Sequence, residues 1–131
     1  MPTDDQPSVS APKTVLIVED NDLTLRFFRD LLELNGYLVL TATSGEPVIE
    51  LARERKPDLI LLDIQLPDIS GTEVARRLKA DEQTGAIPII AATALAMSGD
   101  RGKILASGCD DYIAKPFKGE DLLRLIQRHT S

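Results

Sequence analysis

The 131-residue sequence contains one cysteine, no tryptophan and no long apolar run. A single cysteine, Cys109, excludes an intramolecular disulfide and a zinc site built on several cysteines. Without a long apolar run there is no candidate membrane-spanning helix, so we expect no membrane insertion. The first residues carry Asp4 and Asp5, where a secretory signal peptide would be basic and then apolar. We therefore expect a cytoplasmic protein.

Positive charge is also scarce, with 15 Lys and Arg against 21 Asp and Glu and a net charge of −6. Binding to nucleic acid needs clustered Lys and Arg to neutralise phosphates, so we expect no nucleic-acid partner. The length suits one domain, and 43% hydrophobic residues can supply its core. Residues 1–12 hold three prolines, two serines and two aspartates, a composition typical of a flexible tail. We expect this tail to precede one domain over residues 13–131.

Within that domain, short apolar runs alternate with segments of helical periodicity. The runs predict strands over residues 14–18, 37–42, 58–63, 87–92 and 111–114. The periodic segments predict helices over about 22–35, 45–56, 71–80, 98–107 and 120–128. Ser44 is the expected cap of the second helix, and Leu23, Phe27, Leu31 and Leu34 recur at helical spacing along the first. This alternation predicts an α/β fold, a doubly wound five-stranded parallel sheet with helices on both faces.

Charged or hydroxyl side chains stand at the ends of four of these strands: Glu19 with Asp20, Asp63, Thr93, and Lys115. Ligands of such sheets bind at the carboxyl ends of the strands. With strand order 2-1-3-4-5, the three carboxylates share one pocket, and the other two side chains reach it from the next strands. Close carboxylates repel one another unless a cation intervenes, and Mg²⁺ prefers such oxygen ligands. A carboxylate can also attack phosphorus to form an acyl phosphate, with Lys115 stabilising the developing charge.

The segments that carry these side chains read VLIVEDN, PDLILLDIQLPDISG, IIAATA and YIAKPF. In this order they resemble a response-regulator receiver domain, over about residues 13–129. Within that family, DIQLPDISG and ALAM resemble the stand-alone receivers of the DivK type. The resemblance implies a flavodoxin-like (βα)5 three-layer sandwich with strand order 2-1-3-4-5.

The resemblance also implies roles for the acidic residues and their neighbours. Asp63 would accept a phosphoryl group from the phosphohistidine of a histidine kinase. Asp20 and Asp63 would bind Mg²⁺ directly, Glu19 largely through water, and Gln65 through its main-chain carbonyl. Gln65 and Leu95 would set the lifetime of the phosphate, and we expect Leu95 to hinder the attacking water.

Further implied roles fall on the last two strands. Lys115 would contact the phosphoryl group, and Thr93 would supply the hydroxyl that shifts on phosphorylation. Tyr112 would be the aromatic residue that changes rotamer with Thr93. The bond between Lys115 and Pro116 would be cis, which is accessible because an X–Pro bond has only a small preference for trans.

These roles predict a single-domain response regulator of a two-component or phosphorelay system, which is a phosphoacceptor rather than an ordinary enzyme. Phosphorylation would change the surface of the fourth helix, fifth strand and fifth helix, onto which the apolar segment 94–97 leads. The expected partners are histidine kinases or kinase-like proteins, with control of cell division or polarity as the expected role. We expect a monomer or a weak phosphorylation-dependent dimer.

Two alternatives stay open at this point. The protein could be a phosphorelay carrier that passes phosphate to a histidine phosphotransfer protein. It could also be a phosphohydrolase of the haloacid-dehalogenase type, because residues 20–24 read DNDLT and match the pattern DxDxT. In that alternative Asp20 is the nucleophile, Asp22 the general acid, and Asp110 with Asp111 the later acidic pair.

Overall fold

The computed structural model of the protein describes residues 12–94 and 98–130, of which 98–100 as backbone only. In this part of the chain five strands and five helices alternate. The strands are β1 (Thr14–Val18), β2 (Leu38–Ala42), β3 (Leu59–Asp63), β4 (Ile89–Thr93) and β5 (Asp111–Ala114). The helices are α1 (Asp22–Leu34), α2 (Val48–Arg55), α3 (Gly71–Ala80), α4 (Ser98–Ala106) and α5 (Gly119–Thr130). Apart from the start of α2, every boundary lies within two residues of the sequence prediction.

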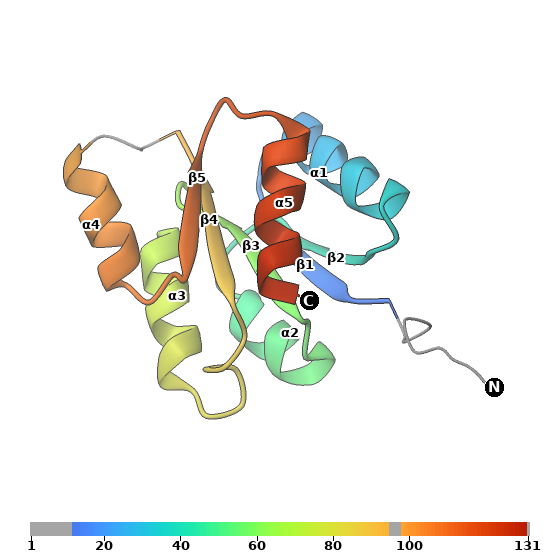
Figure 1. Ribbon diagram of the computed structural model, residues 1–131. Helices are drawn as coiled ribbons and strands as arrows, with labels where there is room; N and C mark the ends of the chain where they lie inside the picture. The colour runs from blue at the N-terminus through green and yellow to red at the C-terminus, as the bar shows by residue number, and fades with distance from the viewer. Residues whose placement is uncertain (1–11, 95–97, 131) are drawn as a thin grey trace.

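The five strands form one sheet in the order β2-β1-β3-β4-β5, and every neighbouring pair is parallel. This order confirms the predicted doubly wound fold. Figure 1 shows the strands side by side, with the helices on either side of them. The strand order reverses between β1 and β3, so the residues that follow these two strands meet at the switch point of the sheet.

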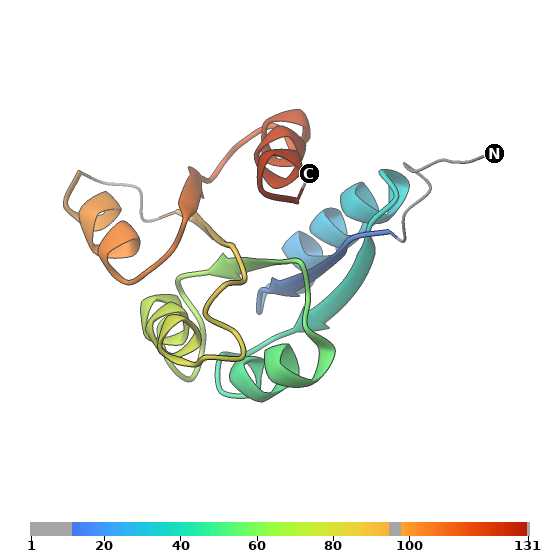
Figure 2. The same ribbon diagram turned by 60° about the horizontal axis from the view of Figure 1, so that its bottom comes forward.

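Two layers of helices enclose the sheet (Figure 2). Helices α1 and α5 cover one face, where their buried residues pack against β1, β3 and β4; these residues are Phe28, Leu32, Leu122 and Ile126. Helices α2, α3 and α4 cover the other face, and their buried residues are Val48, Ala52, Val74, Ala75, Leu78 and Ile104. Strands β3 and β4 are buried along their whole length, which explains their continuous apolar sequence.

Helix α1 buries only some of its apolar residues. Its buried residues are Phe28 and Leu32, whereas Leu23 is 76% exposed and Leu34 is 85% exposed. Phe27 is also exposed, and its ring contacts Phe28 with a centroid distance of 5.9 Å. Both apolar rows of this helix have helical spacing, so periodicity alone does not decide which one faces the sheet.

The start of α2 differs from the predicted one. The helix begins at Val48 after Pro47, and Ser44 does not cap it. The amides of Gly45 and Glu46 instead donate to the carboxylate of Asp68, over 2.8 and 2.7 Å. Asp68 comes from the loop between β3 and α3, so a residue distant in sequence satisfies the N–H groups that Ser44 was expected to serve. In the described residues, no helix is long and apolar enough to cross a membrane.

Candidate functional site

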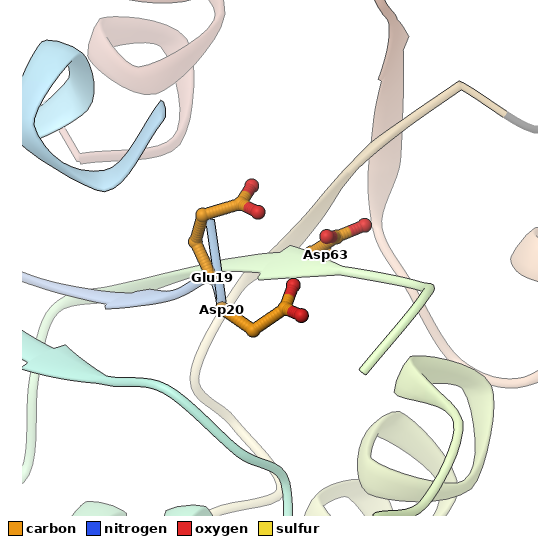
Figure 3. A group of neighbouring side chains, drawn as sticks. All are labelled: Glu19, Asp20 and Asp63. Atoms are coloured by element: carbon orange, nitrogen blue, oxygen red, sulfur yellow. The ribbon is translucent and has the colours of Figure 1, made fainter. Parts of the chain in front are cut away.

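The ends of β1 and β3 bring three carboxylates together. The two strands are parallel neighbours with Val18 opposite Leu62, so Glu19 and Asp63 continue from paired positions. Carboxylate oxygens of Glu19, Asp20 and Asp63 lie within 4.8 Å of one another. Figure 3 shows the three side chains as neighbours. Glu19 is 2% exposed and Asp63 is 7% exposed, whereas Asp20 is open to solvent. The predicted acidic pocket is therefore present, with one solvent-facing carboxylate at its entrance.

The environment of Asp63 disfavours its negative charge. Burial raises the pKa of Asp63 to about 6, and the nearby Glu19 carboxylate raises it as well. The Gln65 amide opposes this shift in pKa by donating to Asp63 Oδ1 over 3.1 Å, and the Lys115 ammonium also lowers it. Asp63 is ionised at pH 7 but poorly solvated, so its charge is available to a cation or an electrophile.

Lys115 reaches into the same pocket from the end of β5. Its Nζ lies 2.9 Å from Glu19 Oε1 and 3.8 Å from Asp63 Oδ2. The other Glu19 oxygen accepts the amide of Asn21 over 3.2 Å. The Lys115 amide donates to the Thr93 carbonyl over 2.9 Å, which fixes the backbone that carries the ammonium. Of the two carboxylate partners of Lys115, Glu19 is therefore the closer and Asp63 the more distant.

The other predicted site residues flank this pocket. Thr93 ends β4 and is fully buried, and Asp63 pairs with the residue before it, Ala92. Tyr112 lies on β5, partly buried, and Gln65 follows Asp63 with an exposed side chain. The peptide bond between residues 115 and 116 is cis, as expected. Residues 95–97, which include the predicted lifetime position Leu95, lie outside the described residues.

Asp68 holds the loop that follows Asp63, and it was not among the site residues predicted from the sequence. Its hydrogen bonds with the Gly45 and Glu46 amides lower the pKa of Asp68 to about 2. The only signal in the sequence is an acidic residue directly after Pro67, which is typical of a turn. The contact ties the loop that carries Gln65 to the start of α2.

Gly71 lets α3 begin close to the backbone of Asp63. A Cβ atom at this position would overlap the Asp63 carbonyl oxygen and the Ile64 Cα atom. The Gly71 amide donates to the Ile64 carbonyl over 2.8 Å, which closes the loop on itself. Gly71 thus has a structural role, because it allows a close approach of two backbones at the site.

The donor set of the pocket fits a hard divalent cation. Three carboxylates face one small space, and two of them are almost fully buried. Among the described side chains, Lys115 is the cation paired with these carboxylates, so the pocket carries excess negative charge. Several carboxylate oxygens without nitrogen or sulfur ligands are typical of Mg²⁺ sites, which keep part of their water shell.

Comparisons with known proteins agree with this geometry. The family described as the response regulator receiver domain matches residues 15–127. The receiver domain of a sensor histidine kinase from Pseudomonas aeruginosa PAO1, solved with a magnesium ion coordinated in its active-site cleft, superposes with a TM-score of 0.86. It is 38% identical, and the alignment covers 92% of this chain and 98% of that one. The chemotaxis response regulator CheY4 of Vibrio cholerae gives a TM-score of 0.84 with 27% identity, covering 90% and 98% of the two chains.

The fold and the acidic pocket are those of a receiver domain, and the chain belongs to the response regulator receiver family. Phosphorylation-controlled switching is general to this family, whose members bind Mg²⁺ in the active site and receive phosphate from histidine kinases. Within the family, the chain is similar to the polar-differentiation response regulator DivK. It is 48% identical to DivK of Brucella anthropi over 118 residues, covering 90% of this chain and 96% of that protein. It is 49% identical to DivK of Brucella ovis over 117 residues, covering 89% and 95%.

The phosphohydrolase alternative does not fit the structure. Asp20 lies at the carboxyl end of β1, but Asp110 and Asp111 stand at the beginning of β5. Because all five strands are parallel, these positions are at opposite edges of the sheet. Asp110 and Asp111 also have other partners, since Asp110 pairs with Lys79 and Asp111 with His129. The later acidic pair of that alternative is therefore absent from the pocket around Asp20.

Proposed function

We propose that this protein is a phosphorylation-controlled switch in which Asp63 accepts a phosphoryl group from the phosphohistidine of a histidine kinase. The supporting observation is the convergence of Glu19, Asp20, Asp63 and Lys115 at one edge of the sheet, in a chain of the receiver family. The similarity to DivK supports a role in polarity or cell division, exerted on histidine kinases or kinase-like proteins.

Asp63 serves as the nucleophile. One carboxylate oxygen attacks phosphorus, the P–N bond of phosphohistidine breaks, and an acyl phosphate forms. Oδ1 is engaged by the Gln65 amide, whereas Oδ2 is the oxygen next to Lys115. The attack by Oδ2 therefore takes place beside an ammonium, which stabilises negative charge on the phosphoryl oxygens.

The three carboxylates hold Mg²⁺ in this proposal, with the main-chain carbonyl of Gln65 as a further ligand. A bound Mg²⁺ supplies positive charge opposite the phosphoryl oxygens. Asp20 faces solvent, so its carboxylate is accessible to the cation. Glu19 has both oxygens engaged, by Lys115 and by the Asn21 amide, which agrees with a contribution through water.

The signal passes to the surface of α4, β5 and α5. The Thr93 hydroxyl moves to the phosphoryl group, and Tyr112 changes rotamer with it. Phosphorylation shifts the balance between two conformations that both exist beforehand. Gln65 and Leu95 set the lifetime of the acyl phosphate, with Leu95 hindering the attacking water. We assign this switch to a receiver unit over residues 13–131 that works as a monomer or a weak phosphorylation-dependent dimer.

Labelling with acetyl phosphate and Mg²⁺ tests the acceptor. Wild type and an Asp22→Asn control, altered at the exposed start of α1, take up one phosphoryl group, and Asp63→Asn takes up none. Chelation of Mg²⁺ abolishes the labelling of wild type. Labelling of Asp63→Asn at Asp20 would contradict both signalling functions.

A second experiment separates a regulator from a phosphorelay carrier. Phosphorylated protein is mixed with a histidine phosphotransfer protein and, separately, with a partner kinase. Rapid movement of the label to the phosphotransfer protein identifies a carrier. A change in kinase activity on binding, without onward transfer, identifies a regulator, which is the outcome that the similarity to DivK favours.

A further inference from the structure

Arg101 and Tyr112 form a contact that links α4 to β5. The Arg101 Cζ lies 5.3 Å from the centre of the Tyr112 ring, within the range of a cation–π interaction. Arg101 is exposed on α4, and Tyr112 is partly buried on β5. Figure 1 shows α4 and β5 as neighbours at one end of the molecule. The contact therefore joins two elements of the surface that changes in the proposed function.

Arg101 contacts an aromatic ring, whereas five other arginines of the described residues pair with carboxylates. Ion pairs with carboxylates engage Arg53, Arg76, Arg77, Arg124 and Arg128. The ion pairs of the described side chains do not include Arg101, and its contact there is with an aromatic ring. A guanidinium stays charged throughout the physiological pH range and stacks well on aromatic rings.

The ring of Tyr112 is held from two directions. It packs against the apolar cluster between the sheet and α2, α3 and α4, which contains Ile104 of α4 and Ala91 of β4. Arg101 lies over the ring from α4. If the Tyr112 ring changes rotamer, other apolar side chains can replace its apolar contacts. The cation–π contact with Arg101 is lost in that change.

We propose that Arg101 is a positioning residue that holds Tyr112 in its unphosphorylated rotamer and so biases the switch toward the resting state. This inference rests on the proposed function, because it takes the Tyr112 rotamer seen here as the resting one and assumes that the ring leaves it on phosphorylation. A cation–π contact at an exposed site corresponds to a factor of about two to five in an equilibrium constant. Arg101 thus raises the resting population relative to the active one by about that factor, without touching the phosphoryl group.

The effect on ligand binding follows by linkage. A ligand that binds only the active conformation must overcome the bias, so its apparent affinity falls by the same factor when the active state is minor. Removal of Arg101 therefore strengthens binding of the phosphoryl mimic BeF₃⁻ in the presence of Mg²⁺ by about two- to five-fold. A purely structural role of Arg101 would weaken such binding or leave it unchanged.

The sequence offers a direct probe, because it contains two tyrosines, Tyr37 and Tyr112. Protein labelled with 3-fluorotyrosine gives one ¹⁹F signal for each. The Tyr37 hydroxyl lies 3.3 Å from Thr130 Oγ1, far from Arg101 in the fold, and its signal serves as the internal reference. The variants are Arg101→Gln, Arg101→Lys, which keeps a cation, and Lys103→Gln, which removes an exposed charge from the same helix.

We expect Arg101→Gln to shift the Tyr112 signal toward its BeF₃⁻-bound position, to leave the Tyr37 signal in place, and to bind BeF₃⁻ about two- to five-fold more tightly. Arg101→Lys restores part of the wild-type behaviour, and Lys103→Gln matches wild type. Unchanged BeF₃⁻ affinity in Arg101→Gln overturns the inference, and so does an equal gain in Lys103→Gln. If BeF₃⁻ moves neither signal in wild type, the switch itself fails. If it moves Tyr112 alone but Arg101→Gln has no effect, only the bias fails.

Discussion

Lys115 lies closer to the carboxylate beside the acceptor than to the acceptor itself. Its Nζ lies 2.9 Å from Glu19 Oε1 but 3.8 Å from Asp63 Oδ2. Asp63 therefore has only the more distant contact with this ammonium, and burial keeps its pKa raised despite it. This arrangement keeps the proposed nucleophile reactive and the ammonium close enough to move onto an incoming phosphoryl group.

The first prediction concerns Glu19→Gln. The Glu19 charge raises the pKa of Asp63, so its removal lowers that pKa below about 6. The substitution also frees Lys115 to approach Asp63, which acts in the same direction. A ¹³C NMR titration of the side-chain carboxyl carbons in metal-free protein measures the change. Asp22→Asn, outside the pocket, leaves the pKa of Asp63 as it is; an unchanged pKa in Glu19→Gln would refute the proposed coupling.

The second prediction concerns stability against pH. The pKa of Asp63 is raised from 3.8 to about 6 in the folded state, so the folded protein keeps this proton at pH values where the unfolded chain has lost it. The contribution of Asp63 to the free energy of unfolding therefore falls as the pH rises from about 4 to 6. Above about pH 6 the ionised side chain destabilises the folded state by the full amount. A shift of this size corresponds to at most about 3 kcal/mol.

We therefore expect metal-free Asp63→Asn to be more stable than wild type by about 1–3 kcal/mol at pH 7.5, with the difference vanishing near pH 4. Denaturant unfolding of both proteins in the presence of a chelator, from pH 4 to 8, measures it. Added Mg²⁺ stabilises wild type more than the variant, because it offsets the repulsion that the variant lacks. A stability difference that stays constant across this pH range would contradict the account.

The third prediction concerns the loop that carries Gln65. Asp68→Asn keeps one acceptor oxygen instead of two, so the Gly45 and Glu46 amides lose part of their bonding. Thermal stability falls by a few degrees, and hydrogen exchange speeds up at these two amides. Because the pKa of Asp68 is lowered to about 2, its contribution is complete above about pH 4 and is lost as the pH falls toward 2. Asp30→Asn, on the exposed side of α1, is the matched control, and equal exchange rates in the two variants would count against the contact.

The fourth prediction concerns Lys79. Its Nζ donates to the carbonyls of Gly85 and Ile87 over 3.3 and 2.9 Å, and to Asp110 over 3.0 Å. Lys79→Met leaves these acceptors partly unsatisfied at the end of the sheet opposite the site. We expect a loss of about 1–3 kcal/mol in the free energy of unfolding, with acetyl-phosphate labelling retained. Lys103→Met, at an exposed position of α4, changes stability by less than about 0.5 kcal/mol; a similar loss in both variants would argue against the role of Lys79.

Much of the fold and the site could be predicted because the signals for them lie within short segments of the sequence. Each strand is a short apolar run, and each is followed by a helical segment, which leaves few topologies. The carboxylates of Glu19 and Asp63 follow or end neighbouring strands, so the strand order was enough to bring them together, and Thr93 ends the next strand. The same reasoning could not choose the buried side of α1, because Phe27 and Phe28 are adjacent and belong to different rows of helical spacing.

What escaped prediction depends on contacts between distant loops and on side-chain reach. Asp68 caps amides more than 20 positions earlier in the chain, and no local pattern connects them. Glu19 follows β1 and Lys115 follows β5, and these strands are not neighbours. The length of both side chains lets their charged ends meet, which a sequence pattern does not show. The contact between Arg101 and Tyr112 joins two elements that neither spacing nor periodicity relates.

The central claim is that Asp63 carries the phosphoryl group, and chemical trapping of the acyl phosphate tests it most directly. The protein is phosphorylated by a histidine kinase with Mg²⁺, reduced with borohydride and digested, and the peptides are mapped by mass spectrometry. Reduction converts a phosphorylated aspartate to homoserine. The account predicts homoserine at position 63 and an unmodified aspartate at position 20. Homoserine at position 20, or label that survives in Asp63→Asn, would contradict it.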